Sequence, residues 1–405
     1  MARKLFGTDG VRGVAGELLT AELALALGRA ATFESSSGRP QVLIVRDTRE
    51  SGPMLEAALA AGVAGEGGDA LTAGVLPTPA ASVLVRRLGL DLAVVISASH
   101  NPWRDNGIKF FGADGRKLGD EAEARIEGSV SGSPPVEAPT SDSIGRIRAL
   151  EGGLDDYLRE LERAFPLDLS GLKVVLDCAN GASHRAAPLI FKRLGAEVET
   201  LATEPDGRNI NEACGSTHPE ALAERVVAAG ASIGFAFDGD ADRVVAVDST
   251  GAVRDGDELI AISALHFAGS GRLEGGVAVT VMSNYGFHNA MAAAGIEVAT
   301  TAVGDRNVST ELGRRNWILG GEQSGHLIWT GFAPTGDGIA AALLTLGALG
   351  GESLAEAQPM VRLPQVLENV DVAEREAVED ADAVWAAVER ENSALEGRGR
   401  VLVRP

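Results

Sequence analysis

The chain has 405 residues, which is too long for one ordinary domain and predicts two to four. Its 45% hydrophobic and 23% charged residues describe a globular protein, and a net charge of -21 argues against a general nucleic-acid or anionic-membrane binder. The two cysteines form no disulfide framework, and the first residues contain no apolar secretory segment, so we expect a cytoplasmic protein.

Short β-branched runs alternate with Ala- and Leu-rich stretches along the chain. Strands are predicted over 42–46, 92–96, 173–177, 232–237, 243–248, 277–282, 317–319 and 400–405. Helices are predicted over 53–64, 182–194, 219–229, 338–351 and 374–391. This alternation predicts an α/β fold whose mixed sheets are covered by helices on both faces.

Three segments interrupt the alternation. Residues 129–143 are rich in Ser and Pro, a turn and a helix start lie near Arg254, and the Ala- and Gly-rich texture ends near Leu363. The predicted domains are 1–150, 151–253, 254–362 and a smaller, incomplete one over 363–405.

Ser99 follows the apolar run 92–96 and precedes Pro102, so we expect it on a loop at the carboxyl end of a buried strand. The G-x-S-x-G pattern of hydrolases is absent, and the neighbouring His100 is poorly placed to take the proton of Ser99. Ser99 therefore suits a phosphoryl carrier, although a serine that caps a turn is the common alternative.

The strongest signal is "FAFDGDADRVVAVD", in which Asp238, Asp240 and Asp242 alternate in a tight turn after an apolar strand. Three such close carboxylates repel one another unless a cation neutralises them, and oxygen ligands favour Mg²⁺ over Mn²⁺ or Ca²⁺. An EF-hand does not fit, because Arg243 and Ser249 occupy the positions that need Gly and Glu. A D-x-D-x-[TV] phosphatase does not fit either, because Asp242 stands where Thr or Val is required.

Lys109 lies in an apolar run, where desolvation is expected to lower its pKa and suit it to acid/base work on a sugar hydroxyl. A surface lysine is the alternative. In "GGEQSGH", Glu322, Ser324 and His326 offer a carboxylate, a hydroxyl and an imidazole for sugar hydroxyls or an amino group, with a glycine-rich connection as the alternative.

Arginines next to glycines provide candidate phosphate ligands. Arg12 lies in "FGTDGVRG", and Arg46 and Arg49 lie in "VRDTRESG", where structural ion pairs are at least as good an interpretation. Asp305 and Arg306 in "VGDRNV" lie at a predicted helix start, which also suits a phosphate.

Together these motifs resemble the α-D-phosphohexomutase superfamily. The resemblance runs from Phe6 to the end in family order, through "FGTDGVRG", "SASHNP", "DGDADRV" and "GGEQSGH". The segments "CGSTHPE", "VMSNYGF" and "VGDR" favour the bacterial branch that acts on glucosamine phosphates. The resemblance implies three similar α/β domains and a smaller α+β fourth domain around a central cleft.

The resemblance also implies roles for individual residues. Ser99 matches the phosphorylated serine, whose phosphate completes a one-ion Mg²⁺ site with Asp238, Asp240 and Asp242. Lys109 and His326 match acid/base positions and Arg243 matches the arginine that closes the metal loop, while His100 is kept as a catalytic candidate. The substrate-binding candidates are Arg12, Gly304, Asp305, Arg306, Glu322, Ser324 and Arg404.

The implied reaction interconverts glucosamine 6-phosphate and glucosamine 1-phosphate through glucosamine 1,6-bisphosphate, towards UDP-N-acetylglucosamine and cell-wall precursors. A homodimer is expected from some relatives. The family continues beyond its final "RP" into a loop that binds the substrate's non-reacting phosphate, whereas this chain stops at Arg404 and Pro405, so we expect slow turnover or none. The alternatives are a phosphoglucomutase or phosphomannomutase, a catalytically impaired phosphosugar-binding protein, and a metal-dependent phosphatase.

Overall fold

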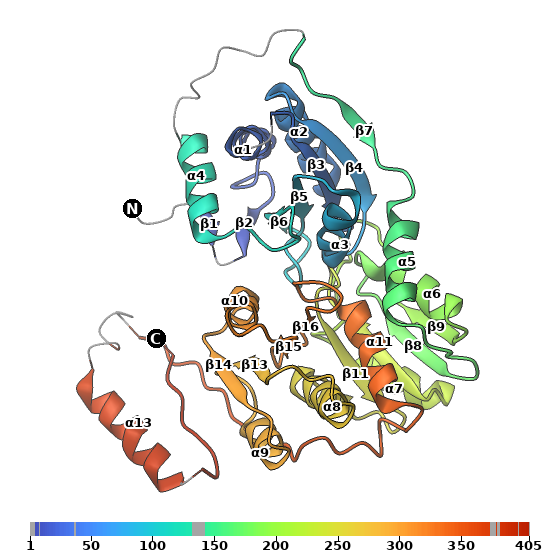
Figure 1. Cartoon of the computed structure of the whole chain (residues 1–405), viewed down its shortest axis with the longest axis vertical. Coiled ribbons are helices and arrows are strands. Elements are labelled where there is room, and N and C mark those ends of the chain that lie inside the picture. Colours follow the sequence, from blue (N-terminus) through green and yellow to red (C-terminus); the bar gives the residue numbers. More distant parts are fainter. Residues whose placement is uncertain are drawn as a thin grey trace.

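The structure is a computed structural model that describes residues 5–7, 9–35, 38–131, 142–372, 378, 381–395 and 397–404. It contains three β-sheets with helices packed on them, arranged one after another along the chain (Figure 1). The predicted connecting segment 129–143 and the predicted acidic helix 374–391 lie partly outside the described residues.

The first α/β domain carries a seven-stranded sheet. Its elements are β1 (Phe6–Gly7), β2 (Gly10–Val14), α1 (Ala21–Glu34), β3 (Gln41–Arg46), α2 (Gly52–Gly65), β4 (Asp69–Val75), α3 (Thr78–Leu88), β5 (Leu92–Ile96), β6 (Asp105–Gly112), α4 (Asp120–Ser131) and β7 (Ile147–Ala149). The strand order is β1-β2-β6-β5-β3-β4-β7, with parallel pairing around β3 and antiparallel pairing of β6 with β5 and β2.

The central strand β3 shows why its sequence is continuously apolar. Val42 and Ile44 pack into a cluster with α1 and α2, whereas Leu43 and Val45 join a cluster with α3. Because successive side chains point to opposite faces and helices cover both faces, every position of this strand except its ends is buried.

The second α/β domain carries a five-stranded sheet of order β12-β11-β10-β8-β9. Its elements are α5 (Gly153–Ala164), β8 (Lys173–Asp177), α6 (Ser183–Arg193), β9 (Glu197–Leu201), α7 (Glu220–Ala229), β10 (Ile233–Phe237), β11 (Val244–Asp248) and β12 (Val253–Arg254). Strand β10 pairs parallel with β8 and antiparallel with β11, so the sheet is mixed, as predicted.

The third α/β domain carries a four-stranded sheet of order β14-β13-β15-β16. Its elements are α8 (Gly256–Gly269), β13 (Val277–Thr280), α9 (Tyr285–Ala293), β14 (Val298–Thr301), α10 (Asp305–Arg315), β15 (Leu319–Gly321), β16 (Leu327–Trp329) and α11 (Gly338–Leu349). Beyond it lies α13 (Asp382–Leu395), which sits apart from the three sheets in Figure 1.

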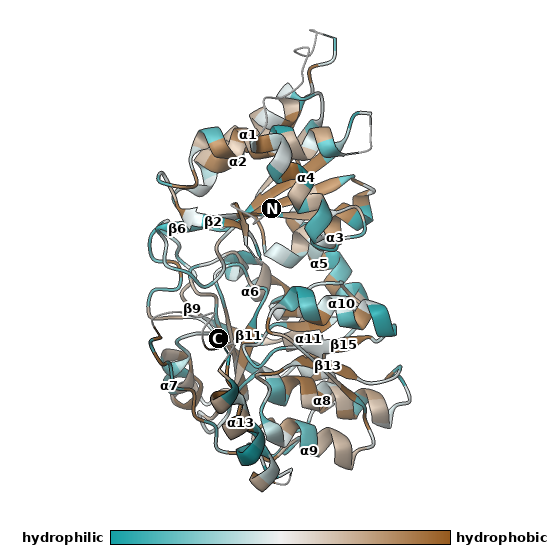
Figure 2. Cartoon of the chain, turned by 90° about the vertical axis from the view of Figure 1, so that its left-hand side faces the viewer, coloured by the Kyte–Doolittle hydropathy of each residue, from teal (hydrophilic) through white to brown (hydrophobic). Residues whose placement is uncertain are grey.

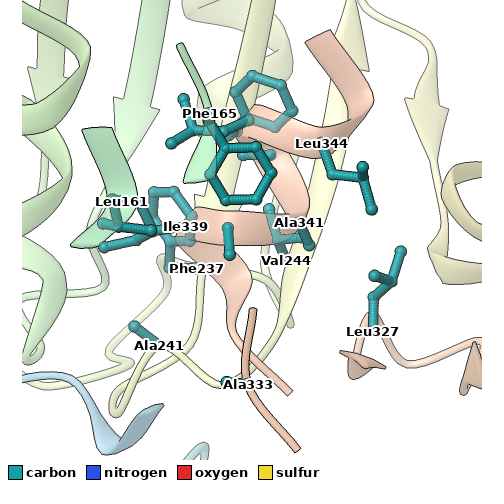
Figure 3. Packing of buried hydrophobic residues seen from close by; sticks show 14 of the residues in the cluster. Leu161, Phe165, Phe237, Ala241, Val244, Leu327, Ala333, Ile339, Ala341 and Leu344 are labelled. Atoms are coloured by element: carbon teal, nitrogen blue, oxygen red, sulfur yellow. The ribbon is translucent and has the colours of Figure 1, made fainter. Parts of the chain in front are cut away.

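The largest hydrophobic cluster joins the three domains. Leu161 and Phe165 of the α5 region, Phe237 of β10 and Ile339 of α11 pack together close to the turn after β10 (Figure 3). Figure 2 shows the strands as largely hydrophobic and α10 as mainly hydrophilic. Because side chains of all three domains share this core, the packing does not divide one domain sharply from the next. The domain bounds that the sequence predicted therefore stay predictions.

Most of the strands and helices that the sequence predicted lie within one or two residues of their observed bounds, but several others, such as α1, β4 and β6, were not predicted. The predicted final strand is wrong, because residues 400–404 form no strand. The side chain of Asn392 bonds both the N–H and the C=O of Val401, at 2.7 and 3.1 Å, and so occupies the backbone groups that a strand would pair. Among the described helices, none has the length and apolar character needed to cross a membrane.

Candidate active site

Two loops meet where the first and second domains touch. The serine loop, residues 97–104, connects β5 to β6, and the aspartate loop, residues 238–243, connects β10 to β11. Ser99 is 1% exposed, and its Oγ donates a hydrogen bond to Oδ2 of Asp238. A Cβ on Gly239 would lie 2.6 Å from the carbonyl oxygen of Ser99, so only glycine permits this close approach.

His100 lies beside the serine hydroxyl. Its Nδ1 is 3.3 Å from Ser99 Oγ, but that hydroxyl donates to Asp238, so the expectation that His100 is poorly placed to take the Ser99 proton stays a prediction. Burial lowers the pKa of His100, and the nearby Arg243 and Arg12 lower it further. The ring therefore favours its neutral form beside the hydroxyl.

The three aspartates of the aspartate loop form one cluster. Each offers a carboxylate oxygen within 4.8 Å of the others, and all three side chains are buried. Burial and the neighbouring carboxylates of Asp242 and Asp240 raise the pKa of Asp238 well above its usual range. One carboxylate oxygen each of Asp240 and Asp242 is buried without a hydrogen-bond partner among the described residues. The unpaired oxygens and the all-oxygen donor set fit a hard divalent cation.

Asp240 is held by two groups of the first domain. Its Oδ2 accepts hydrogen bonds from Thr78 Oγ1 at 2.7 Å and from Lys109 Nζ at 3.0 Å, and its backbone carbonyl accepts from the N–H of Thr78 at 2.9 Å. Burial raises the pKa of Asp240, but the Lys109 ammonium and the Thr78 hydroxyl lower it more, so it stays ionised.

Lys109 is 1% exposed on β6 and lies among carboxylates. Its Nζ is 3.0 Å from Asp240, 3.1 Å from Asp9 and 3.8 Å from Asp242. The expectation that burial lowers its pKa is wrong in its net result. Desolvation acts in that direction, but the carboxylates of Asp240, Asp9 and Asp242 outweigh it and raise the pKa of Lys109. The side chain is therefore a buried cation.

His326 lies at the end of the loop between β15 and β16 and is 2% exposed. Its Nδ1 is 3.5 Å from Asp242 Oδ1, and its Nε2 accepts a hydrogen bond from the N–H of Gly336 at 3.1 Å. This pairing implies a neutral ring with its proton on Nδ1, directed at Asp242. Both ring nitrogens therefore contact protein groups in this arrangement.

Glu322 and Gly304 are joined directly. The Oε1 of Glu322 accepts a hydrogen bond from the N–H of Gly304 at 3.0 Å, which ties the β15–β16 connection to the start of α10. Ser324, on the same connection, is exposed. The Glu322 carboxylate is thus buried and bonded to the backbone, whereas the Ser324 side chain faces solvent.

A second charged cluster joins the first and third domains. Lys117 is paired with both Asp9 and Asp305, and Asp9 is also paired with Arg12. Burial raises the pKa of Asp305, but the Lys117 ammonium outweighs this effect and lowers the pKa to about 2. Arg12 and Asp305 thus lie beside Lys109 and His326 but already have oppositely charged partners.

Three of the predicted arginines differ in their surroundings. The N–H of Arg243 donates to Asp238 Oδ1 at 3.2 Å, while its guanidinium Nε lies 3.8 Å from Asp242. Arg306 is paired with Glu123 and, at 2.6 Å, with Asp120 of α4. Arg404 is exposed near the C-terminal end, which Figure 1 shows beside α13 and apart from the two loops. The described residues thus bring Arg243, but not Arg404, to the site.

Sequence reasoning missed Thr78 and Lys117. Thr78 precedes a proline at the start of α3, and Lys117 follows a turn after β6, so each has an ordinary local environment. Their contacts with Asp240 and Asp305 join residues that are 162 and 188 positions apart. Spacing along one chain carries no signal for such pairs.

Comparison with protein families matches three successive domain models. Residues 3–134 match the phosphoglucomutase/phosphomannomutase alpha/beta/alpha domain I, residues 155–251 match domain II, and residues 255–363 match domain III. The three matches follow the three sheets in order.

Curated relatives extend the likeness over almost the whole chain. A phosphoglucosamine mutase of Moorella thermoacetica is 52% identical over 99% of this chain and 92% of its own length. One of Desulforudis audaxviator is 51% identical over 99% of this chain and 91% of its own length. Among solved structures, a putative phosphomannomutase from Thermus thermophilus is 26% identical with a TM-score of 0.76, over 87% of this chain and 81% of that one. The chain therefore belongs to the phosphoglucomutase/phosphomannomutase family and, within it, to the phosphoglucosamine mutases.

Proposed function

We propose that the chain interconverts glucosamine 6-phosphate and glucosamine 1-phosphate, with Ser99 as the phosphoryl carrier. The observation that supports this most is the hydrogen bond from Ser99 Oγ to Asp238, which places the hydroxyl against a buried cluster of three carboxylates. A serine protease would need a base and an oxyanion hole here, whereas a phosphoserine needs a cation next to its oxygens.

Asp238, Asp240 and Asp242 are proposed to hold one Mg²⁺. Their three carboxylates and the two unpaired oxygens supply hard ligands, and a phosphate on Ser99 would supply another. The ion, when bound, neutralises charge on the phosphoryl group in transfer. The protein contributes a rigid frame, because Thr78 and the backbone N–H of Arg243 already orient two of the carboxylates.

In the proposed reaction the phosphate on Ser99 passes to the O1 hydroxyl of glucosamine 6-phosphate, forming glucosamine 1,6-bisphosphate and freeing Ser99 Oγ. After the bisphosphate reverses its orientation, its O6 phosphate returns to Ser99 Oγ and glucosamine 1-phosphate is released. The proton of each attacking hydroxyl must leave as the new P–O bond forms. His100 is one proposed acceptor, and His326 is the other once the N–H of Gly336 leaves its Nε2. Lys109, held as a cation, is suited to stabilise negative charge.

The remaining candidates are assigned by position. Glu322, Ser324 and Gly304 line one edge of the site and are proposed to read the sugar. Arg12, Asp305, Arg306 and Arg404 are proposed for phosphate and ring contacts, which requires the present ion pairs of Arg12 and Arg306 to exchange when substrate binds. A cytoplasmic homodimer without nucleic-acid partners stays a prediction.

The test is the mass of the peptide that contains Ser99 after incubation with Mg²⁺ and glucosamine 1,6-bisphosphate. The proposal expects one added phosphate, its absence in Ser99→Ala, and its loss when EDTA is present. This readout needs a single transfer and therefore does not depend on rapid turnover. An unmodified Ser99 in a folded chain would contradict the proposal.

A competition assay then decides the sugar. Glucosamine, glucose and mannose 6-phosphates at equal concentration should show preference for glucosamine. Preference for glucose or mannose would make the chain a phosphoglucomutase or phosphomannomutase instead, and sustained release of inorganic phosphate would make it a phosphatase.

A further inference from the structure

Arg49 is a fully buried cation behind the serine loop. Its Nε donates to Asp47 Oδ2 at 2.8 Å. Its other four N–H groups donate to backbone carbonyls, namely those of Ser99 (2.8 Å), Asn101 (2.9 Å), Pro102 and Asp105 (2.9 Å). All five donors of the guanidinium are thus engaged, and none remains for a phosphate. The interpretation of Arg49 as a phosphate ligand is therefore wrong, and the structural alternative is confirmed.

Asp47 also helps to hold Ser99, through a hydrogen bond to Ser97. Its Oδ2 also accepts a hydrogen bond from Ser97 Oγ at 2.6 Å, and that oxygen in turn accepts the N–H of Ser99 at 3.0 Å. The N–H of Ser99 is therefore held through Ser97, and its carbonyl is held by Arg49. The Arg49–Asp47 pair therefore holds the C=O of Ser99 directly and its N–H through Ser97.

Ser99 needs such control because of its backbone. Its φ of 51° lies in the left-handed region, which costs a residue with a Cβ about 1–2 kcal/mol. Asn211 of the second domain donates to the same Ser99 carbonyl at 3.0 Å, so two domains hold one peptide group. This conformation directs Oγ at Asp238.

A fully buried ion pair is weak evidence for stability, because the cost of desolvating both charges offsets much of their attraction. Its contacts instead converge on the short segment that carries the reacting hydroxyl. We propose that Arg49 is a positioning residue for phosphoryl transfer. Through the backbone of the serine loop it keeps Ser99 Oγ directed at the aspartate loop, and it does not itself touch the substrate. This inference rests on the proposed function.

The decisive variant is Arg49→Lys. This variant keeps the positive charge beside Asp47. The single ammonium group of lysine, however, cannot bond the four backbone carbonyls that the planar guanidinium of Arg49 bonds. A displacement of about 1 Å at a reacting atom can cost about a hundredfold in rate, so we expect the phosphorylation of Ser99 and kcat to fall by about that factor. The KM for glucosamine 6-phosphate and the affinity for Mn²⁺ should stay close to those of the unaltered chain, because their ligands are untouched.

Arg29→Lys is the matched control. Arg29 of α1 pairs with Glu66 at 3.1 Å on a partly exposed face, so its exchange should leave the phosphorylation rate unchanged. Rates are expressed per folded molecule, since a residue that only stabilised the fold would lower Tm without changing this rate. Equal rates in Arg49→Lys and Arg29→Lys would overturn the proposal.

A second variant covers misfolding of Arg49→Lys. Ser97→Ala removes the acceptor of the Ser99 N–H but leaves Arg49 and Asp47 in place, and we expect the phosphorylation rate to fall by about tenfold, the effect of one lost hydrogen bond. A folded Ser97→Ala chain with an unchanged rate would overturn the proposal. Failure of the unaltered chain to become phosphorylated would instead contradict the proposed function, so the two failures are distinguishable.

Discussion

The serine loop and the aspartate loop solve a similar problem in different ways. Each follows a buried strand, and each contains a residue other than glycine in the left-handed region, Ser99 with φ 51° and Ala241 with φ 61°. The serine loop is held mainly from inside its own domain by Arg49, whose charge Asp47 balances, and Asn211 of the second domain adds a hydrogen bond to the Ser99 carbonyl. The two buried charges behind the serine loop therefore balance each other without a bound ligand.

The aspartate loop is held from outside its domain. Thr78 of the first domain binds Asp240, and in the third domain the N–H of Gly338 donates to the carbonyl of Ala241 at 2.9 Å. Lys109 lies against Asp240 and Asp242 as a buried cation, and the guanidinium of Arg243 lies 3.8 Å from Asp242. The difference teaches that the serine loop is held mainly by contacts within the first domain, whereas the aspartate loop depends more on contacts from the two other domains and has a carboxylate cluster that the proposed metal ion would neutralise.

The largest effect should come from changing the charge of the aspartate loop. Asp242→Asn removes one proposed metal ligand, and we expect kcat to fall by about a thousandfold or more with weaker binding of Mg²⁺. Steady-state assays across a Mg²⁺ titration measure both quantities. Asp248→Asn is the control, because that buried carboxylate pairs with Arg254 outside the loop. Full activity of Asp242→Asn without added metal would refute the dependence on a cation.

A smaller effect should follow from loosening the aspartate loop without changing its charge. Thr78→Val removes the hydroxyl that donates to Asp240 at 2.7 Å. A hydrogen bond to a charged acceptor contributes about 1.5–3 kcal/mol, so kcat should fall by about tenfold or more. Thr78→Ser keeps the hydroxyl and should retain most activity. If Val and Ser at this position behave alike, the contact between the domains does not position the loop.

A third effect, on stability and not on turnover, concerns the segment that supports the aspartate loop from the third domain. Asp337 caps α11 and accepts a hydrogen bond from Tyr157 at 2.7 Å, and burial raises its pKa from 3.8 to about 6. The folded chain therefore holds this proton more tightly than the unfolded chain. The resulting stabilisation is complete below about pH 4 and is lost as the pH rises through about 6, a total of about 3 kcal/mol.

Asp337→Asn cannot ionise, so its Tm relative to the unaltered chain should rise between pH 4 and pH 7 and level off above. Thermal unfolding at a series of pH values measures this difference. Asp114→Asn, at a side chain that is 64% exposed, should show no such trend. A difference that stays constant with pH would show that Asp337 ionises alike in both states.

The local parts of this protein were readable from the sequence. The apolar strands, the turn with Asp238, Asp240 and Asp242, and the loop with Ser99 all follow from patterns within about ten residues, because strand periodicity and turn chemistry are local. The approach of the two loops was not readable, since it depends on how two sheets pack. The resemblance to a family supplied that link.

The sequence by itself predicted the candidate side chains for chemistry apart from Thr78 and Lys117, while the tertiary structure decided the partners of these side chains. Lys109 illustrates this, because its apolar neighbours predicted a lowered pKa, whereas carboxylates from distant segments raise it. Arg49 had two interpretations until the carbonyls of the serine loop were seen to occupy its donors. The physical reason is that desolvation follows from local composition, but charge pairing and hydrogen bonding depend on contacts between segments that only packing brings together.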